Sequence, residues 1–240
     1  RDTSGTTPAG GQFSTVFLPT KKSGTPVITA TVTVLGSPIP AIGTYSQEII
    51  ADTPLRADNF YTKSASVGSI TDITVRVTDQ YGNPVTSKKK PNLVSFNTTT
   101  TVSGDNDNQF DDPGLPTVGV KNLAIALNDS GYARVRFSLR THPGDNFVYI
   151  TPPIPIPASL IKIQGIPDLP PADIVQTVQP GGRPPTLPTG KESKFTINYQ
   201  LYDKYKNPSA NQNLLISTSA GESRVILSNN DGNVAISYGP

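Results

Sequence analysis

Four aspartates in one polar stretch are the side chains of this sequence best suited to bind a metal ion. Asp105, Asp107, Asp111 and Asp112 lie in the segment Ser-Gly-Asp-Asn-Asp-Asn-Gln-Phe-Asp-Asp. Calcium prefers several hard oxygen ligands, and alternate aspartates in a loop can supply them. The segment lacks the glycine and the final glutamate of an EF-hand loop. A solvated acidic loop without a cofactor is the simpler interpretation, and a calcium site remains the alternative.

The sequence does not favour a catalytic or metal site built on histidine, because His142 is the only histidine and the chain contains no cysteine. His142 stands in a His-Pro-Gly-Asp turn without a second imidazole or a thiol. Nucleophilic catalysis requires a nucleophile and a base in mutual reach, oriented by a third group. The absence of cysteine also rules out disulfide bonds and thiolate metal ligands. We therefore predict no catalytic residues and no enzymatic activity.

Two triplets fit the pattern of N-glycosylation acceptors, and one short run is basic. The triplets begin at Asn97 and Asn128, in a chain where Asn and Thr are frequent enough to produce them by chance. The basic run is Lys88-Lys89-Lys90, and the net charge is only +2. Nucleic-acid binders usually carry a strongly basic face. We predict a solvated loop for the lysines and no nucleic-acid partner.

The elements that carry these residues repeat along the chain. Asp79-Gln-Tyr-Gly-Asn-Pro84 recurs as Asp203-Lys-Tyr-Lys-Asn-Pro208, an offset of 203 − 79 = 124 residues. Residues 131–151 align without a gap on residues 11–31, an offset of 131 − 11 = 120. Self-similarity at a fixed period is typical of arrays of small units. Arrays of this kind are usually spacers, fibres or adhesins.

Alternating apolar residues predict strands in each copy and no sustained helix. Period 2 places every second side chain on the same face of a sheet. Ile73, Val75 and Val77 alternate in this way, and Ile197, Tyr199 and Leu201 repeat the pattern 124 residues later. The predicted core consists of these six residues with Phe96, Val135 and Phe137. The fold class is therefore all-β, and units near the ~100 residues usual for an immunoglobulin-type sandwich predict tandem β-sandwiches of that type.

The repeats divide the chain into three parts. We expect residues 1–36 to be the closing strands of a preceding unit, or of one completed by a partner. Residues 37–158 form a complete sandwich, in which 98–116 is an inserted polar loop and 151–158 a stiff proline-rich spacer. Residues 159–240 form a second sandwich that lacks its final strand.

The repeated turns have a structural explanation. Asp and Asn side chains bond to nearby backbone groups, Gly provides unusual φ values, and Pro ends the turn. We assign this role to Asp79, Gly82, Asn83 and Pro84 in one copy. Asp203, Asn207 and Pro208 take it in the other, where Lys206 replaces the glycine.

At these positions the chain resembles the bacterial immunoglobulin-like repeats of the invasin and intimin type. The shared features are the Asp-x-x-Gly-Asn-Pro-Val turn at 79–85, a Val-x-Phe strand at 94–96, and later matches at Asp129, Ala133, Gly144 and Val148. The resemblance covers most of residues 45–240, and its closing part also covers 11–34. It implies a β-sandwich, an extracellular or cell-surface location, and a role as a rigid or adhesive stalk without catalytic residues.

The out-of-phase ends have two interpretations. In one, the sequence is a section of a longer tandem array, which would also account for the absence of methionine. In the other, the chain is a filament subunit. The N-terminal strands of one copy then complete the C-terminal sandwich of the next, because an unpaired strand edge accepts an added strand. Contacts of this head-to-tail kind need not close into a ring.

We therefore predict a non-enzymatic extracellular structural protein, either a stalk or adhesin segment or a subunit of a filament. Its partners would be copies of itself or neighbouring immunoglobulin-like repeats, with a host or cell-surface receptor as a further possibility. The alternative is an accessory carbohydrate-binding or spacer module of a secreted enzyme. The absence of tryptophan and an aromatic content of 7% disfavour the carbohydrate-binding version.

Overall fold

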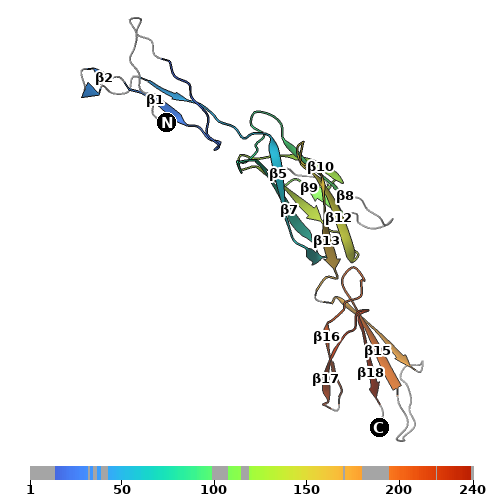
Figure 1. Cartoon of the computed structure of the whole chain (residues 1–240). Coiled ribbons are helices and arrows are strands. Elements are labelled where there is room, and N and C mark those ends of the chain that lie inside the picture. The colour runs from blue at the N-terminus through green and yellow to red at the C-terminus, as the bar shows by residue number, and fades with distance from the viewer. Residues whose placement is uncertain are drawn as a thin grey trace.

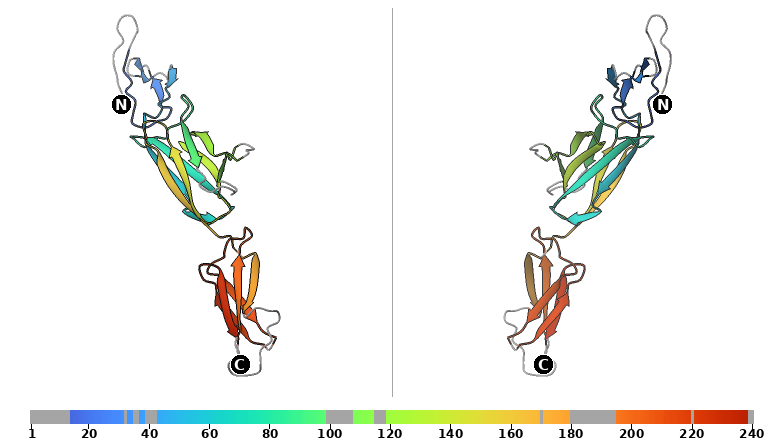
Figure 2. Two further views of the ribbon diagram at one scale, coloured as in Figure 1. Left: turned by 90° about the vertical axis from the view of Figure 1, so that its right-hand side faces the viewer. Right: turned by 90° about the vertical axis from the view of Figure 1, so that its left-hand side faces the viewer.

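The chain folds into three successive groups of β-strands that follow one another along an elongated molecule (Figures 1 and 2). The computed structural model describes residues 14–31, 33–34, 37–38, 43–98, 108–114, 119–169, 171–179, 195–219 and 221–238. The fold is all-β, with tandem β-sandwiches of the immunoglobulin-like type, as the alternating sequence patterns predict. No helix long and apolar enough to cross a membrane occurs in this described part of the chain.

The middle unit is a two-sheet sandwich. One sheet has five strands in the order β10-β8-β12-β13-β6, and the facing sheet has four in the order β5-β7-β11-β9. The strands are β5 (Pro54–Tyr61), β6 (Ser64–Ser66), β7 (Ile70–Asp79), β8 (Leu93–Thr98), β9 (Gln109–Asp111), β10 (Asn122–Ala126), β11 (Tyr132–Ser138), β12 (Gly144–Thr151) and β13 (Ser159–Ile166).

The core of the middle unit consists of the inward-facing residues of both sheets. From Ile73 to Val77 of β7 and from Ala133 to Phe137 of β11, every second side chain is fully buried, because the pleat directs it between the sheets. The predicted core residues Ile73, Val75, Val77, Phe96, Val135 and Phe137 all have 0% exposure. Their counterparts in the last unit differ, since Leu201 is buried whereas Ile197 and Tyr199 are only half-buried.

Phe110 corrects the prediction that residues 98–116 form only a polar loop. It lies on β9, which pairs with β11, and its side chain is fully buried. Its ring packs between those of Phe96 and Phe137, at centroid distances of 6.2 and 5.2 Å. A three-residue strand with one apolar side chain is too short to show an alternating pattern, which is why the sequence does not reveal it.

Strand β13 corrects the predicted boundary after residue 158. It pairs along its length with β12 in the five-stranded sheet, so residues 151–158 connect two neighbouring strands of one unit rather than two units. Ile161 and Ile163 point into the core, while Leu160, Lys162 and Gln164 point outward. The alternation was present in the sequence, but the preceding prolines suggested a linker.

The last unit has a three-stranded sheet and a two-stranded sheet. The first has the order β14-β15-β18, and the second pairs β16 with β17. Their bounds are β14 (Asp173–Gln179), β15 (Phe195–Tyr202), β16 (Asn213–Ser217), β17 (Ser223–Leu227) and β18 (Asn233–Tyr238). Among the described residues, this unit has no counterpart of β12 or β13.

The first group of strands is small, and its strands β1 and β4 are largely exposed where their side chains are described. Its strands are β1 (Val27–Ala30), β2 (Thr33–Val34), β3 (Ser37–Pro38) and β4 (Gly43–Ser46). Strand β1 pairs antiparallel with β4, and β2 with β3. Strand β4 lies beyond residue 36, so this group extends further than the predicted boundary. Of the four residues of β1, only Ile28 is partly buried.

We predict that Val135→Asp unfolds the middle unit. Val135 is fully buried on β11, and an unpaired carboxylate has no hydrogen-bonding partner among the apolar side chains there. The expected loss is more than about 4 kcal/mol of the free energy of unfolding. Thermal melting followed by circular dichroism measures it. Arg136→Asn, on the outward face of the same strand, should melt close to the unsubstituted chain. An unchanged melting temperature for Val135→Asp would contradict the assigned core.

Candidate functional site

The turn at residues 79–84 is organised by one carboxylate. Asp79 Oδ1 accepts hydrogen bonds from the backbone N–H groups of Tyr81 and Asn83, at 2.8 and 2.9 Å. Asp79 Oδ2 accepts from the Asn83 side-chain amide at 2.8 Å and from the backbone N–H of Asp52 at 3.0 Å. Gly82 has a φ of +81°, a value that glycine adopts without strain. The carboxylate thus closes the turn and also fixes the segment that leads into β5.

The turn at residues 203–208 repeats this arrangement in the last unit. Asp203 Oδ1 accepts from the backbone N–H groups of Tyr205 and Asn207, both at 2.8 Å. Asp203 Oδ2 accepts from the Asn207 amide at 2.9 Å and from the backbone N–H of Asp168 at 3.1 Å. Lys206 has a φ of +67°, so the lysine takes the left-handed conformation of Gly82. We call these two segments the Asp-Asn turns.

Hydrogen bonding keeps both aspartates ionised. Burial raises the pKa of Asp79, but bonds from the Asn83 side chain and from three backbone N–H groups outweigh burial and lower that pKa below 3.8. The same balance lowers the pKa of Asp203, where burial is opposed by bonds from Asn207, Asp168 and Tyr205. The carboxylate oxygens of both turns therefore accept hydrogen bonds from the protein itself and are not directed at a ligand.

Both Asp-Asn turns also touch the preceding group of strands. The Asn83 side-chain amide donates to the backbone oxygen of Lys21 at 2.8 Å, and the backbone N–H of Ser23 donates to Asn83 Oδ1 at 3.0 Å. The Asn207 amide donates to the backbone oxygen of Thr141 at 2.7 Å. The turn motifs alone do not predict these contacts, because the partner atoms belong to the backbone 60 or more residues away.

Strand β16 has one edge without a neighbouring strand among the described residues. The matching strand of the middle unit, β8, pairs with β10 on one side and β12 on the other. Backbone bonds fix the match, since Leu127 N–H donates to Asn92 O in one unit and Ser228 N–H to Gln212 O in the other. Val94 and Phe96 of β8 are fully buried, whereas Leu214 and Ile216 of β16 are only half-buried. This open edge is the second candidate site.

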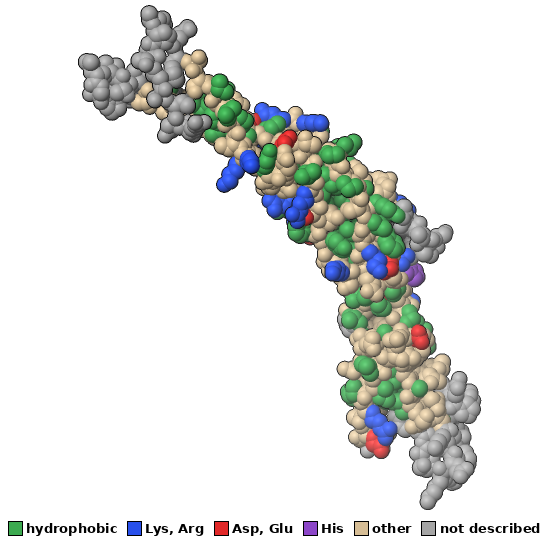
Figure 3. All heavy atoms as spheres, viewed as in Figure 1, with side chains coloured by type: hydrophobic (Ala, Val, Ile, Leu, Met, Phe, Trp, Pro, Cys, Tyr) green, Lys and Arg blue, Asp and Glu red, His purple; other side chains and the backbone are tan. Residues whose placement is uncertain are grey.

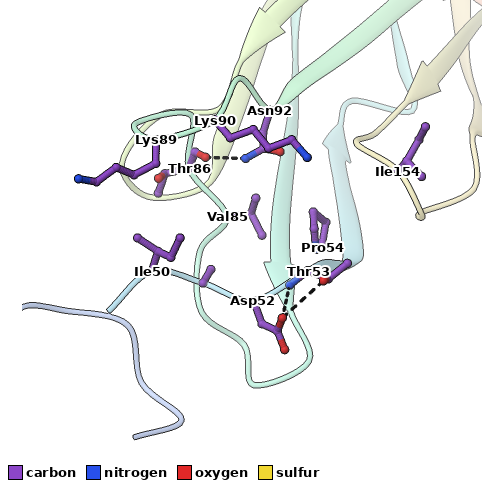
Figure 4. Close-up of a pocket in the computed structure, with 11 residues that line it drawn as sticks. Ile50, Asp52, Thr53, Pro54, Val85, Thr86, Lys89, Lys90, Asn92 and Ile154 are labelled. Carbon is purple, nitrogen blue, oxygen red and sulfur yellow. Dashed lines mark hydrogen bonds between the residues drawn. The ribbon is translucent and has the colours of Figure 1, made fainter. Parts of the chain in front are cut away.

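A recess of about 300 Å³ lies at the end of the middle unit nearest the first group of strands (Figure 4). Its lining mixes the apolar side chains of Ile50, Val85 and Ile154 with Asp52 and two lysines. Lys89 forms an ion pair with Glu48 at 3.0 Å. Asp52 accepts from the backbone N–H of Thr53 at 2.7 Å and from the Gln80 amide at 2.9 Å. Asp52 and Lys89 are thus both bonded to neighbouring protein groups, and no serine, cysteine or histidine lies among the residues that line the recess.

The predicted metal ligands are only partly described. Asp105 and Asp107 lie outside the described residues. Asp111 ends β9 with one buried carboxylate oxygen, and Asp112 accepts from the backbone N–H of Gly114 at 2.8 Å. Within the described ranges, no three His, Cys, Asp or Glu side chains come together as a metal site would require. The calcium site remains a prediction that rests on the sequence.

The other predicted residues lie on the surface. Asn97 is exposed on β8, and Thr98 of its triplet is buried and donates to Phe147 O. Asn128 is exposed, and its side-chain oxygen accepts from the backbone N–H groups of Ser130 and Tyr132, both at 3.0 Å. His142 is exposed in the turn before β12.

Basic and acidic side chains are scattered over the face in Figure 3, without a continuous basic patch.

Comparison with known proteins finds similarity in structure only. No protein-family model matches the chain. No curated protein matches it in sequence. Among solved structures, the chain is similar to the Escherichia coli adhesin FdeC, with 15% identity and a TM-score of 0.54, over 89% of this chain and 64% of that one. At this identity the likeness concerns the fold.

Two structures of the surface layer protein SbsC are also similar. Domains 1–6 match with 14% identity and a TM-score of 0.35, over 79% of this chain and 23% of that one. Domains 4–9 match with 13% identity and a TM-score of 0.34, over 89% of this chain and 33% of that one. The chain therefore spans less than two thirds of the length of each of these three structures.

We predict that acid destabilises the last unit through Asp203. The pKa of Asp203 is lower in the folded chain than its ordinary value, so the resulting stabilisation is complete above pH 3.8. It is lost as the pH falls from 3.8 through the lower folded-state pKa. Hydrogen exchange followed by mass spectrometry at a series of pH values measures this for each unit. Asp203→Asn should flatten the pH dependence of the last unit, and Asp79→Asn that of the middle unit. If the stability of each unit changed with pH equally in the unsubstituted chain, in Asp203→Asn and in Asp79→Asn, this assignment would be refuted.

Proposed function

We propose that the chain is a non-enzymatic stalk segment of a bacterial cell-surface protein, of the invasin and intimin type. The observation that carries the proposal is the repeated joint, in which an Asp-Asn turn of one unit bonds to the backbone of the unit before it. Units that follow one another in a line with fixed contacts make an extended spacer (Figure 2). FdeC, an adhesin, has a similar fold, and this supports a surface location for the chain.

A spacer needs units that fold without a ligand, and the middle unit meets this requirement. Its two sheets bury a core of their own, so its stability does not depend on a bound molecule. The polar turns are placed at the ends of the units, where they form joints. The partners in this proposal are neighbouring immunoglobulin-like units and a receptor carried elsewhere along the stalk. An accessory module of a secreted enzyme would use the same architecture, and no described contact favours it.

A specific observation supports a second function, that of a filament subunit. Strand β1 is the repeat counterpart of residues 147–150 of β12, at the offset of 120, and it pairs with β4 in a hairpin as β12 pairs with β13. In the middle unit, β12 joins its sheet by pairing with β8. Strand β16, the counterpart of β8, has its corresponding edge open. The β1–β4 hairpin of a second copy would therefore fill this edge as β12 fills it in the middle unit.

The middle unit also predicts the register of such an exchange. Tyr149 lies opposite Asn97, and Ile150 opposite Phe96. With the offset of 120, Thr29 would lie opposite Ser217, and Ala30 opposite Ile216. Ile28 takes the place of the buried Val148, and so its side chain would enter the open core. Backbone bonds to the edge provide affinity, and Ile28 provides the apolar contact.

The stalk proposal predicts a long, stiff particle. A compact domain of 240 residues has a radius of gyration of about 18 Å. Small-angle X-ray scattering of the monomeric chain should give a value at least ~1.5 times larger than this compact estimate. Images by negative-stain microscopy should show thin rods of one preferred shape. A radius near the compact value would overturn the proposal.

The filament proposal predicts concentration-dependent head-to-tail assembly of this chain. Ile28→Asp should abolish assembly, because it would place a charge in the recipient core. Val27→Asp is the matched control, because Val27 is 61% exposed on the opposite face of β1. Analytical ultracentrifugation measures the assembly state. If the unsubstituted chain stays monomeric at every concentration, strand exchange between copies is refuted and the stalk proposal stands.

A further inference from the structure

We propose that the asparagine of each Asp-Asn turn is a latch that sets the orientation of one unit on the unit before it. Asn83 and Asn207 would then be joint residues as well as turn residues. The inference deepens the stalk proposal by naming the contact that makes the stalk stiff. It rests on distances and repeat positions at both joints.

The two joints use the same atoms at equivalent positions. Asn83 donates to the backbone oxygen of Lys21, and Asn207 donates to that of Thr141. Thr141 is the repeat counterpart of Lys21, since 141 − 21 = 120, and Asn207 is that of Asn83, since 207 − 83 = 124. Both acceptors precede a positive-φ glycine by three residues, Gly24 in one case and Gly144 in the other. A contact that recurs with the repeat is a property of the unit, not of one place in the chain.

The aspartate orients the latch. A side-chain amide has two N–H donors, and in each turn one of them is held by the aspartate Oδ2. The second donor then points out of the turn towards the preceding unit. The same carboxylate oxygen accepts the backbone N–H of Asp52 or Asp168, in the segment that links the two units. One carboxylate thus fixes both the linker and the group that bridges the joint.

The joints differ in their additional contacts. At the first, the N–H of Ser23 donates to Asn83 Oδ1. The counterpart of Ser23 is Pro143, which has no N–H to donate. At the second joint the ring of Tyr205 packs on Gly68 of the middle unit, and a Cβ at Gly68 would lie 2.1 Å from the tyrosine hydroxyl. At the first, the ammonium group of Lys21 lies 5.6 Å from the centre of the Tyr81 ring.

The test measures the distance between one label on the middle unit and one on the last unit, and the spread of that distance reports how firmly the two units are held. The chain has no cysteine, so Ser95→Cys and Val225→Cys provide two specific, exposed sites for fluorescent labels. Single-molecule energy transfer should give one narrow distance distribution for the chain that carries only these two substitutions. Asn207→Ala should broaden it and raise the undocked population by roughly two- to tenfold, the factor expected for one lost hydrogen bond.

Asn229→Ala is the matched control. Asn229 accepts from the backbone N–H groups of Asp231 and Asn233, within the last unit and away from the joint. It should lower the melting temperature of the last unit without broadening the distribution. Gly68→Ala provides a second variant, because it leaves the side chains of Asp203 and Asn207 unchanged and displaces the ring of Tyr205, so the mean distance should shift.

The outcomes separate the latch from the stalk. A narrow distribution that Asn207→Ala leaves unchanged overturns the latch while the stalk proposal stands. Equal broadening by Asn207→Ala and Asn229→Ala assigns the effect to destabilisation of the last unit, and also overturns the latch. A broad distribution in the labelled chain without further substitution means that the units are not held in line, and it overturns the stalk proposal itself.

Discussion

The joints between the units depend on one interaction, a buried carboxylate that accepts four hydrogen bonds. Asp79 and Asp203 each lie at the end of a strand, and each gathers two N–H groups of the turn, one of the linker and one of the asparagine side chain. Burial alone would favour the neutral acid, and the four donors reverse that preference. The strand, the turn and the entry of the chain into the unit are thereby fixed by one group. The joints between units are a consequence of this local constraint.

The second constraint is that each sandwich needs two complete sheets to bury its core. The middle unit has them, and Val94 and Phe96 are inaccessible to solvent. In the last unit the sheet of β16 and β17 has two strands in the described residues, and the matching side chains are half-buried. In the filament proposal, the strand that covers them is extended and has apolar residues at every second position. Strand β1, in which Ile28 and Ala30 are two residues apart, has this alternation.

The alternating strands were predictable from sequence, because period 2 runs from Ile73 to Val77 in β7 and from Ala133 to Phe137 in β11, and both strands face a single core. The alternating pattern did not predict a strand where the strand was very short or where the neighbouring residues indicated a loop. Phe110 stands alone in a polar stretch, and β13 follows a run of prolines. The roles of Asn83 and Asn207 were only half predictable. Their turns follow from residue type. Their bonds across the joints end on backbone oxygens, and the side chains of Lys21 and Thr141 do not indicate that these oxygens are acceptors.

The bonds from Asn83 and Asn207 end on main-chain oxygen atoms, and this has an evolutionary consequence. An atom common to all residues places no demand on the side chain that carries it, and the acceptors here are a lysine and a threonine. Neighbouring units can therefore diverge at these acceptor positions without losing the two hydrogen bonds. Duplication, deletion or exchange of whole units within a gene would leave compatible junctions, so the length of such a protein can change faster than its architecture.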